Sequence, residues 1–536
     1  MNGYVIALVV FLAWIAFVYV LHKSKWLEKH NMSLMGPAIM WRTNKGREFV
    51  YKVASKERVW NIYGMMALWI CAGAMLAIMA LLLWEATLVK RITTPPSPEL
   101  ILGIPGINPI IPVGYGILAL VVAIAVHELS HGIMTRLGKM KVVSMGLLFL
   151  VFPIGAFVEP DEKQLKETTR RNRSRVFAAG PATNIIVALL FLGLFSSVMM
   201  SSLEPVRDGV LSEGVVDGSP AELAGIKPNS VVVSVGGVLI HDTGDFQARS
   251  SPDPGSLVTV DFYYKDQLNS VEFVDGVVVT FVAEDFAAHT SGMRAGMVLV
   301  SLNDIPILNR SVLDDTMATL VADQTVDLTV MSYDQSSEQF VVNASISTIT
   351  MSDKWDYYDK YNPGKNKDSF KGVAFMGGGF LDLGLDASNV TLYSGVLSHP
   401  FAHMSDPDDF TRSWLRLITL PFLDLAPMRS PVTDLYEPSG SLAWMPDSLF
   451  WILTNSFYWI FWINLMVGLT NVLPMVPLDG GYIFRDGFDY LLSRAAKGLS
   501  KEKREAWTGN LTTILALFVF ALILWQIIGP SLNSYW

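Results

Sequence analysis

The sequence predicts a polytopic α-helical membrane protein that carries α+β or all-β domains outside the cytoplasm. Three observations indicate this fold class. Of 536 residues, 51% are hydrophobic and only 17% are charged, and the mean hydropathy of +0.38 is too high for an ordinary soluble protein. Apolar windows of membrane-spanning length recur along the chain. A long acidic segment, residues 203–447, separates the fourth window from the fifth.

The apolar windows predict six membrane spans. A bilayer core about 30 Å thick requires about 20 apolar residues in a helix. The six windows are Tyr4–Leu21, Ile62–Trp84, Pro112–Val126 with its continuation through two histidines, Val176–Met200, Ser448–Leu473 and Leu511–Ile528. Basic residues follow the first window, whereas a secretory signal carries its positive charge in front. We therefore expect the first span to be a retained anchor.

Lysine and arginine collect in three loops, which predicts the orientation in the membrane. There are nine of them from Lys23 to Arg58, eight from Lys139 to Arg175 and six from Arg485 to Arg504. Because cytoplasmic loops are rich in these residues, we place the three loops in the cytoplasm. Residues 203–447 contain 14 basic and 34 acidic residues, so we place them outside and exclude nucleic acid as a partner there. A single cysteine, Cys71, excludes an intramolecular disulfide.

The third window contains the sequence His127-Glu128-Leu129-Ser130-His131. Ionisable groups at membrane depth are costly and usually mark a functional site. Histidines four residues apart lie on one face of a helix, where both imidazoles can reach one metal ion. Glu128 could then act as general base on a water that zinc makes acidic. The alternative is a metal-free structural role, which would leave three buried ionisable groups without nearby partners.

A catalytic zinc site needs a third protein ligand and one open position. No other histidine falls inside a span, so we expect a carboxylate, and Asp479 ends the fifth apolar run at the depth predicted for His131. Pro474, Pro477 and Gly480 would break a regular helix there. Such a break is tolerated where it is buried in protein or lines a wet cavity. The alternative is that Asp479 caps the span at the membrane interface.

Three motifs occur together in the order found in one known family. They are HELSH in one span, Gly180-Pro181-Ala182-Thr183-Asn184 in the next, and Asn471 through Gly480 in a later one. With them the chain resembles the site-2 protease family of intramembrane zinc metalloproteases over residues 110–200 and 450–530. The resemblance implies that His127, His131 and Asp479 bind Zn²⁺ and that Glu128 activates water. It also implies that Asn184 and Asn471 hold the substrate backbone or stabilise the oxyanion, although a buried Asn can simply bond a neighbouring helix.

Residues 142–158 are rich in β-branched and aromatic residues, punctuated by Gly146, Pro153 and Gly155. They are marginal in length for a span, and a span here would move the following basic residues to the wrong side. We therefore expect a re-entrant β-hairpin, whose edge could receive an unwound substrate segment as an added strand. The alternative is a structural loop in the membrane interface.

The acidic segment contains a tandem repeat. Gly225–Gly237 and Gly292–Asp304 align without a gap at an offset of 67 residues. Each unit resembles a PDZ domain of the bacterial protease type, and the first begins a helix with Gly218-Ser-Pro-Ala221, which the second lacks. The resemblance implies that the units bind extended peptide ends along a strand edge or act as a size filter. A purely structural role is the alternative for the second copy.

These predictions divide the chain into six regions. They are 1–100 with two spans and a basic cytoplasmic loop, 101–202 with the first part of the catalytic core, 203–275 and 276–351 with the PDZ-like units, 352–447 of unassigned fold, and 448–536 with the second part of the core. In the unassigned region, His399 and His403 flank Pro-Phe-Ala, where Pro400 replaces the glutamate of a metalloprotease motif. We interpret this stretch as a surface loop.

The sequence thus predicts a multi-pass cell-membrane zinc endopeptidase that cleaves transmembrane segments of membrane proteins in regulated intramembrane proteolysis. We expect its active site toward the cytoplasmic side and its partners to be membrane-protein substrates, the lipid bilayer and peptide ends at the PDZ-like units. One alternative is a non-catalytic PDZ-bearing membrane chaperone or scaffold, which would have no use for Glu128. A metal transporter is another, but it would show paired half-helices and an acidic path through the other spans.

Overall fold

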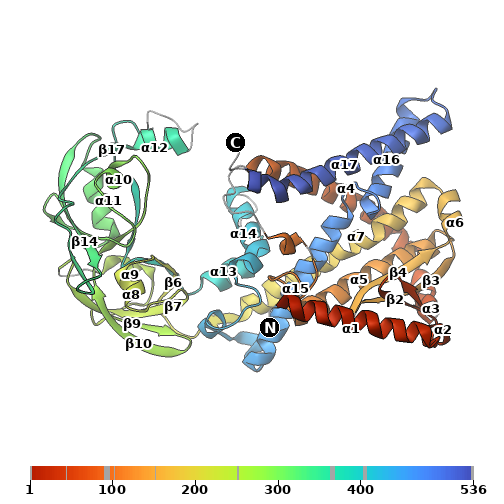
Figure 1. Cartoon of the computed structure of the whole chain (residues 1–536), viewed down its shortest axis with the longest axis horizontal. Coiled ribbons are helices and arrows are strands. Elements are labelled where there is room, and N and C mark those ends of the chain that lie inside the picture. Colours follow the sequence, from red (N-terminus) through yellow and green to blue (C-terminus); the bar gives the residue numbers. More distant parts are fainter. Residues whose placement is uncertain are drawn as a thin grey trace. The chain divides into compact units, whose positions relative to one another are not determined.

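The structure is a computed structural model that describes residues 3–43, 45–89, 97–101, 103–150, 152–249, 253–361, 369–401 and 407–532. The chain forms two compact units (Figure 1). The helical unit comprises residues 1–198, 415–427 and 452–536, and the sheet unit comprises residues 199–414 and 428–451.

Five helices are long and apolar enough to cross a membrane, counted over the described residues. They are α4 (Glu57–Leu88), α5 (Val113–Leu137), α7 (Arg170–Gly193, which continues in helical turns to Ser202), α15 (Asp447–Asn471) and α17 (Lys501–Leu532). Each contains one of the predicted windows, as expected of a membrane protein. The remaining window lies in α1 (Gly3–Lys23), of which Phe11–Lys23 counts as a shorter apolar helix. The number of spans stays a prediction.

A four-stranded antiparallel sheet packs beside α5 in the helical unit (Figure 1). Its strands β3 (Val142–Leu150) and β4 (Phe152–Pro160) form the hairpin that the sequence predicts. The other two, β1 (Met32–Met35) and β2 (Ala38–Thr43), lie in the basic segment where the sequence analysis predicts only a loop. The strand order is β1-β2-β3-β4, so β4 is an edge strand. Short helices flank the sheet: α2 (Trp26–Lys29), α3 (Lys45–Ala54) and α6 (Glu162–Glu167).

The proline-containing segment after α15 breaks the helix as predicted. Helix α15 ends at Asn471, and a new helix, α16 (Asp479–Ala495), begins at Asp479. Asp479 is therefore the first residue of a separate helix and does not belong to the end of the fifth span. The start of α16 folds back on the end of α15, since a Cβ atom at Gly480 would lie 2.2 Å from the carbonyl oxygen of Val472. Only glycine leaves room for this turn.

The sheet unit contains two sheets with the same order of elements. The first repeat runs β6 (Val210–Val215), α8 (Pro220–Leu223), β7 (Ser230–Val235), β8 (Val238–Leu239), α9 (Thr243–Ala248), β9 (Leu257–Tyr264) and β10 (Gln267–Val274). The second runs β11 (Val277–Val282), α10 (Ala287–Thr290), β12 (Val298–Leu302), β13 (Ile305–Pro306), α11 (Arg310–Ala318), β14 (Thr325–Asp334) and β15 (Gln339–Val342). The starts of β6 and β11 are 67 residues apart, as are those of α9 and α11. The tandem repeat is therefore confirmed as a structural repeat.

The second repeat forms its first helix without the Ser-Pro-Ala element. In the first repeat, the Ser219 hydroxyl caps α8 by accepting a hydrogen bond from the Glu222 N–H at 3.2 Å. At the same place in the second repeat, Phe286 precedes α10 and provides no side-chain cap. Helix α10 is instead held by burial, because Ala287 and Ala288 lie in the core of the second sheet.

Two strands from the region of unassigned fold complete the two sheets. Strand β19 (Gly378–Asp382) pairs with β11, and β20 (Leu385–Asn389) pairs with β6. The sheet orders are β10-β9-β7-β6-β20 and β15-β14-β12-β11-β19. Residues 374–389 therefore belong to the fold of both repeats, although they follow the predicted end of the second repeat.

The remaining helices and strands include β5 (Leu203–Pro205), β16 (Thr348–Thr350), β17 (Ser352–Asp353), α12 (Lys354–Tyr361), β18 (Ala374–Phe375), α13 (Leu392–Ser398), α14 (Pro407–Thr419) and β21 (Tyr436–Pro438). Strand β16 pairs with β14 in the second sheet, and there are two short strand pairs, β17 with β18 and β5 with β21. His403 of the predicted surface loop lies outside the described residues.

Candidate metal centre

Helix α5 presents His127 and His131 on one face, as their spacing predicts. The two ring centroids are 4.7 Å apart and the ring planes meet at 78°. His127 is only 8% exposed. Between them, the Ser130 hydroxyl contacts the Thr183 hydroxyl of α7 at 2.6 Å, which ties α5 to α7 and fixes the direction of the histidine face.

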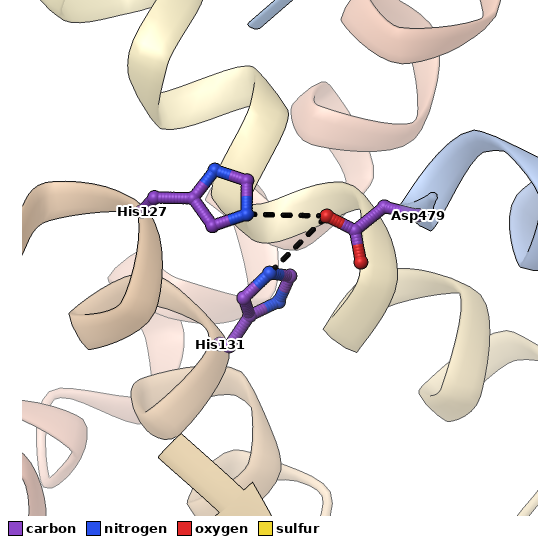
Figure 2. Close-up of side chains that lie close together, drawn as sticks. All are labelled: His127, His131 and Asp479. Carbon is purple, nitrogen blue, oxygen red and sulfur yellow. Dashed lines mark ion pairs between the residues drawn. The ribbon is translucent and has the colours of Figure 1, made fainter. Parts of the chain in front are cut away.

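Helix α16 brings Asp479 to both histidines (Figure 2). Asp479 Oδ2 lies 3.2 Å from Nε2 of His127 and 3.3 Å from Nε2 of His131. Two ligands that each bind a tetrahedral zinc ion at about 2.0–2.2 Å are separated by about 3.3–3.6 Å. The spacing of the three ligand atoms therefore suits one zinc ion. The N-terminus of a helix also favours a carboxylate, because its free N–H groups carry partial positive charge.

A hydrogen bond sets the tautomer of His131. Its Nδ1 lies 2.7 Å from the carbonyl oxygen of Val176 on α7. A carbonyl only accepts, so Nδ1 carries the proton and donates it. In the neutral ring this leaves the lone pair on Nε2, which is the atom that faces Asp479. Metal-binding histidines usually have such an outer partner, which fixes both ring orientation and tautomer.

Gly180 leaves space for the histidine rings. A Cβ atom at this position of α7 would lie 2.5 Å from Nε2 of His131 and 2.6 Å from Nε2 of His127. Real Cβ atoms do not approach so closely, so a side chain here would displace the metal-binding atoms. Gly180 lies within a sequence motif, but the sequence alone assigns it no role. The missing side chain is what the site requires.

Glu128, the neighbour of His127 in α5, contacts the edge strand of the sheet. Its Oε2 accepts a hydrogen bond from the backbone N–H of Val158 at 2.9 Å. Val158 belongs to β4, whose only strand partner among the described residues is β3. The N–H of Val158 therefore points out of the sheet edge and binds the Glu128 carboxylate.

Comparison with known proteins assigns the family. The sequence matches Peptidase family M50 over residues 115–519, which is more than half of the chain. The chain belongs to this family. It is the family of the site-2 proteases, so the resemblance based on three motifs is confirmed. The matched range begins in α5 and ends in α17, and it includes all three candidate ligands.

Two curated relatives of this M50 chain illustrate the similarity. It is 33% identical over 162 residues to an uncharacterized protein of Methanocaldococcus jannaschii, which covers 29% of the chain and 42% of that protein. It is 26% identical over 283 residues to a protein of Thermotoga maritima named "Putative zinc metalloprotease", which covers 46% of the chain and 53% of that protein. The chain thus spans about half the length of these relatives. Family and relative together support a metalloprotease with zinc as the metal.

The two candidate substrate-binding asparagines differ in their surroundings. Asn184 of α7 is fully buried, and neither atom of its amide has a hydrogen-bond partner within the described part of the chain. Burying an amide without partners is unfavourable, so it is usually kept for a purpose. Asn471, by contrast, is partly exposed and donates to the Val467 carbonyl of its own helix at 3.0 Å. The structure brings neither side chain into the group of three metal-binding residues.

Asn464 is a buried polar residue that the sequence analysis misses. It lies in α15 and is fully buried; its Nδ2 donates to the Ile460 carbonyl at 2.8 Å, while its Oδ1 has no partner among the described residues. One turn later in α15, Gly468 packs against Pro181 and Ile185 of α7. The signal available in the sequence was an asparagine inside an apolar window.

The three ligand residues fit a zinc ion in number, chemistry and position. Over the residues that the structure describes, they form the one group of three or more His, Cys, Asp or Glu side chains that are close enough to hold a metal. Two imidazoles and a carboxylate are common zinc ligands, and three protein ligands leave the fourth position for water or substrate. Among the described residues no lysine or arginine pairs with Asp479, so a metal ion would supply the positive charge that this partly buried carboxylate needs.

Proposed function

We propose that this M50 chain is a zinc-dependent intramembrane endopeptidase that cleaves transmembrane segments of membrane proteins in regulated intramembrane proteolysis. One observation carries the proposal. His127, His131 and Asp479 converge on one point from α5 and α16, and α5 is long and apolar enough to cross a membrane. A site with these ligands hydrolyses peptide bonds in other metalloproteases, and its position in an apolar helix favours a membrane-embedded substrate.

The chain's own residues would divide the work of hydrolysis. His127, His131 and Asp479 would hold zinc, which when bound supplies a Lewis acid that polarises the scissile carbonyl and activates water. Glu128 would take the proton from the attacking water and later pass it to the leaving amine. Gly180 keeps the space against both Nε2 atoms free of a side chain. The Val176 carbonyl holds His131 in the orientation needed for binding.

The outer edge of β4 would bind the substrate. A peptide bond inside a helix is shielded by its own turn, so a transmembrane segment must unwind before it can be cut. The unwound segment then needs hydrogen-bond partners for its backbone, which an edge strand provides. The hydrogen bond from the Val158 N–H to Glu128 supports this proposal, because it joins the outer edge of β4 to the proposed base. Asn184 and Asn471 would bind further backbone groups of the substrate or the oxyanion.

We also propose a multi-pass arrangement in the cell membrane, with the zinc site toward the cytoplasm and the sheet unit outside. The distribution of basic residues around the apolar helices supports this orientation. The repeated β-rich units would act as PDZ-like domains that bind peptide ends or limit the size of substrates. A substrate would then be shortened outside before it is cut within the bilayer.

Mapping of a cleavage site tests the proposal. The full-length protein is reconstituted into lipid vesicles with a reporter that carries one transmembrane segment between two soluble domains. Mass spectrometry then locates the new ends. We expect a cut inside the apolar segment that is abolished by a zinc chelator and restored by added zinc. Cuts confined to the soluble linkers would contradict an intramembrane reaction, and an absence of cleavage with zinc bound would favour a non-catalytic role.

A further inference from the structure

Helices α7 and α16 face each other through three successive positions. Arg173 and Phe177 of α7 lie opposite Asp486 and Tyr482 of α16. At the third position, Gly180 of α7 and Asp479 of α16 both approach Nε2 of the two histidines. The numbers rise on one helix as they fall on the other, so the helices run antiparallel. Spacings of three and four residues keep each set on one face of its helix. We call these three facing positions the α7–α16 ladder.

The first position of the ladder is an ion pair between a partly exposed arginine and a buried aspartate. Arg173 Nε donates to both carboxylate oxygens of Asp486, at 2.9 and 3.2 Å. Asp486 is only 5% exposed, and it also accepts a hydrogen bond from the Ser174 hydroxyl at 3.3 Å. Charge-assisted bonds of this kind are strong and directional. Removing the partner of a buried carboxylate is costly, so the pair resists sliding.

The second and third positions connect the ion pair to the metal centre. Phe177 and Tyr482 stack with ring centroids 4.4 Å apart and planes only 11° from parallel. Gly180 then lies against Nε2 of both histidines, the same atoms that Asp479 approaches from α16. The ion pair is therefore two turns of helix away from the third zinc ligand, on the same face.

The register of α16 has to be fixed by packing. Seven residues without regular helical structure separate α15 from α16. Their turn packs against the first residues of α16 at Gly480, and contacts with α7 hold the helix beyond that turn. A slide by one residue moves a helix by about 1.5 Å. Zinc–ligand distances vary by only about 0.2 Å. A small shift of α16 would therefore take Asp479 out of reach of the metal.

We propose that Arg173 and Asp486 are positioning residues that set the register of α16 on α7 and thereby hold Asp479 as the third zinc ligand. A second brace supports the same helix, since Asp489 pairs with Arg170 of α7 and with Arg504 of α17, the latter at 2.6 Å. The inference rests on the proposed function in that it takes the three residues as the zinc site. It can be tested through metal binding without any cleavage.

The test compares metal binding by full-length variants in detergent. The variants are Arg173→Met, Asp486→Asn and the exchanged pair Arg173→Asp with Asp486→Arg. Arg171→Met is the matched control, because this neighbour in α7 is exposed and donates to Met65 Sδ rather than to α16. Zinc affinity is measured by competition with a chelator. The visible spectrum of the Co²⁺-substituted protein reports the coordination of the metal.

Each single variant should bind zinc about 10–100-fold more weakly, as is typical when a group that orients a ligand is lost. Its Co²⁺ spectrum should change as one protein ligand is lost. The exchanged pair should recover much of the zinc affinity and of the wild-type Co²⁺ spectrum. Arg171→Met should match the wild type in both measurements. Wild-type affinity and spectrum in Arg173→Met would overturn the inference. If the single variants fail to fold, the exchanged pair decides. An exchanged pair that folds but binds zinc more weakly than the wild type would also overturn the inference.

The two proposals fail in different ways. If the wild type binds zinc and the variants behave as expected, but no variant or wild type cleaves a transmembrane reporter, the proposed function fails and the positioning role stands. If the wild type binds zinc and cleaves, and Arg173→Met does both equally well, the positioning role fails alone.

Discussion

Two clusters of ionisable side chains, one in each unit, differ in how their charges are balanced. In the helical unit, His127, His131 and Asp479 direct three metal-binding atoms at one point, and Asp479 pairs with no lysine or arginine in the described part of the chain. In the sheet unit, the Arg249 guanidinium lies 3.8 Å from Asp275 and 3.7 Å from Asp382. That cluster carries its own cation.

This difference predicts what each cluster does. The Arg249 cluster of the sheet unit is called the outer cluster, and the metal centre the inner cluster. The outer cluster joins the residue after α9 to Asp275 in the turn between β10 and β11, and to Asp382 at the end of β19. It therefore holds the two repeats together. The inner cluster is complete only with a metal ion. Changes to the inner cluster should therefore affect metal and activity while leaving the fold intact, and changes to the outer cluster should do the reverse.

The largest effect is expected for His127→Ala. Loss of a direct ligand should weaken zinc binding by more than the about 10–100-fold seen when an outer partner of a ligand is changed. Cleavage of a transmembrane reporter should fall with it. Metal analysis and a cleavage assay of the purified protein check this. His241→Ala, an exposed histidine of the sheet unit, serves as control, and an equal loss of zinc there would contradict the assignment.

Arg249→Met should have a large effect on the stability of the sheet unit and none on zinc binding. It leaves Asp275 and Asp382 buried without their cation, which should destabilise the sheet unit by about 3–5 kcal/mol. Hydrogen exchange should accelerate in β11 and β19, while bound zinc stays at one per chain. Arg207→Met, which removes a more exposed ion pair, should change exchange little. Loss of zinc in Arg249→Met with unchanged hydrogen exchange would contradict the assignment of a structural role to this cluster.

Gly180→Ala should be intermediate in effect. Its Cβ would overlap the space next to both histidine Nε2 atoms, so the rings must shift. We expect about 10–100-fold weaker zinc binding, comparable to the loss of an outer partner. Gly193→Ala in the same helix has open space around its Cβ position and is the matched control. Equal zinc affinity in the two variants would show that the space at Gly180 is not needed.

The smallest effect is expected from pH at the outer cluster. Burial raises the pKa of Asp382, and the Arg249 guanidinium opposes this shift. The folded state then holds the proton more tightly than the unfolded chain, so this stabilising contribution is present below the ordinary pKa and declines as pH rises through the raised one. Asp382→Asn should remove that decline. Hydrogen exchange of β19, corrected for the intrinsic rate at each pH, would show a parallel decline in both proteins if the prediction is wrong.

The residues of the metal centre are predictable where their chemistry is local. The histidine spacing in α5 and the prolines around Asp479 are visible in the sequence, and both predict what the structure contains. The role of Gly180 is not visible in this way, because the absence of a side chain carries no chemical signal. The Arg173–Asp486 pair joins residues 313 positions apart, which no local pattern reveals.

The same distinction applies to the fold. Apolar windows predict the long helices, since burial in lipid needs a continuous run of apolar residues. Strand β20 pairs with β6 across more than 170 residues, so its place in the first sheet depends on a contact that sequence periodicity does not encode. Strands β1 and β2 escape prediction because each is short and basic residues surround them.

The measurement that tests the central claim most directly is a comparison of wild type with Glu128→Gln for bound zinc and for cleavage of a reporter transmembrane segment. The substitution keeps the size of the side chain but removes its ability to take a proton from water, and Glu128 is not among the three ligands. The account predicts that zinc is retained and cleavage is abolished. Equal cleavage by both proteins, or no bound zinc in either, would contradict it.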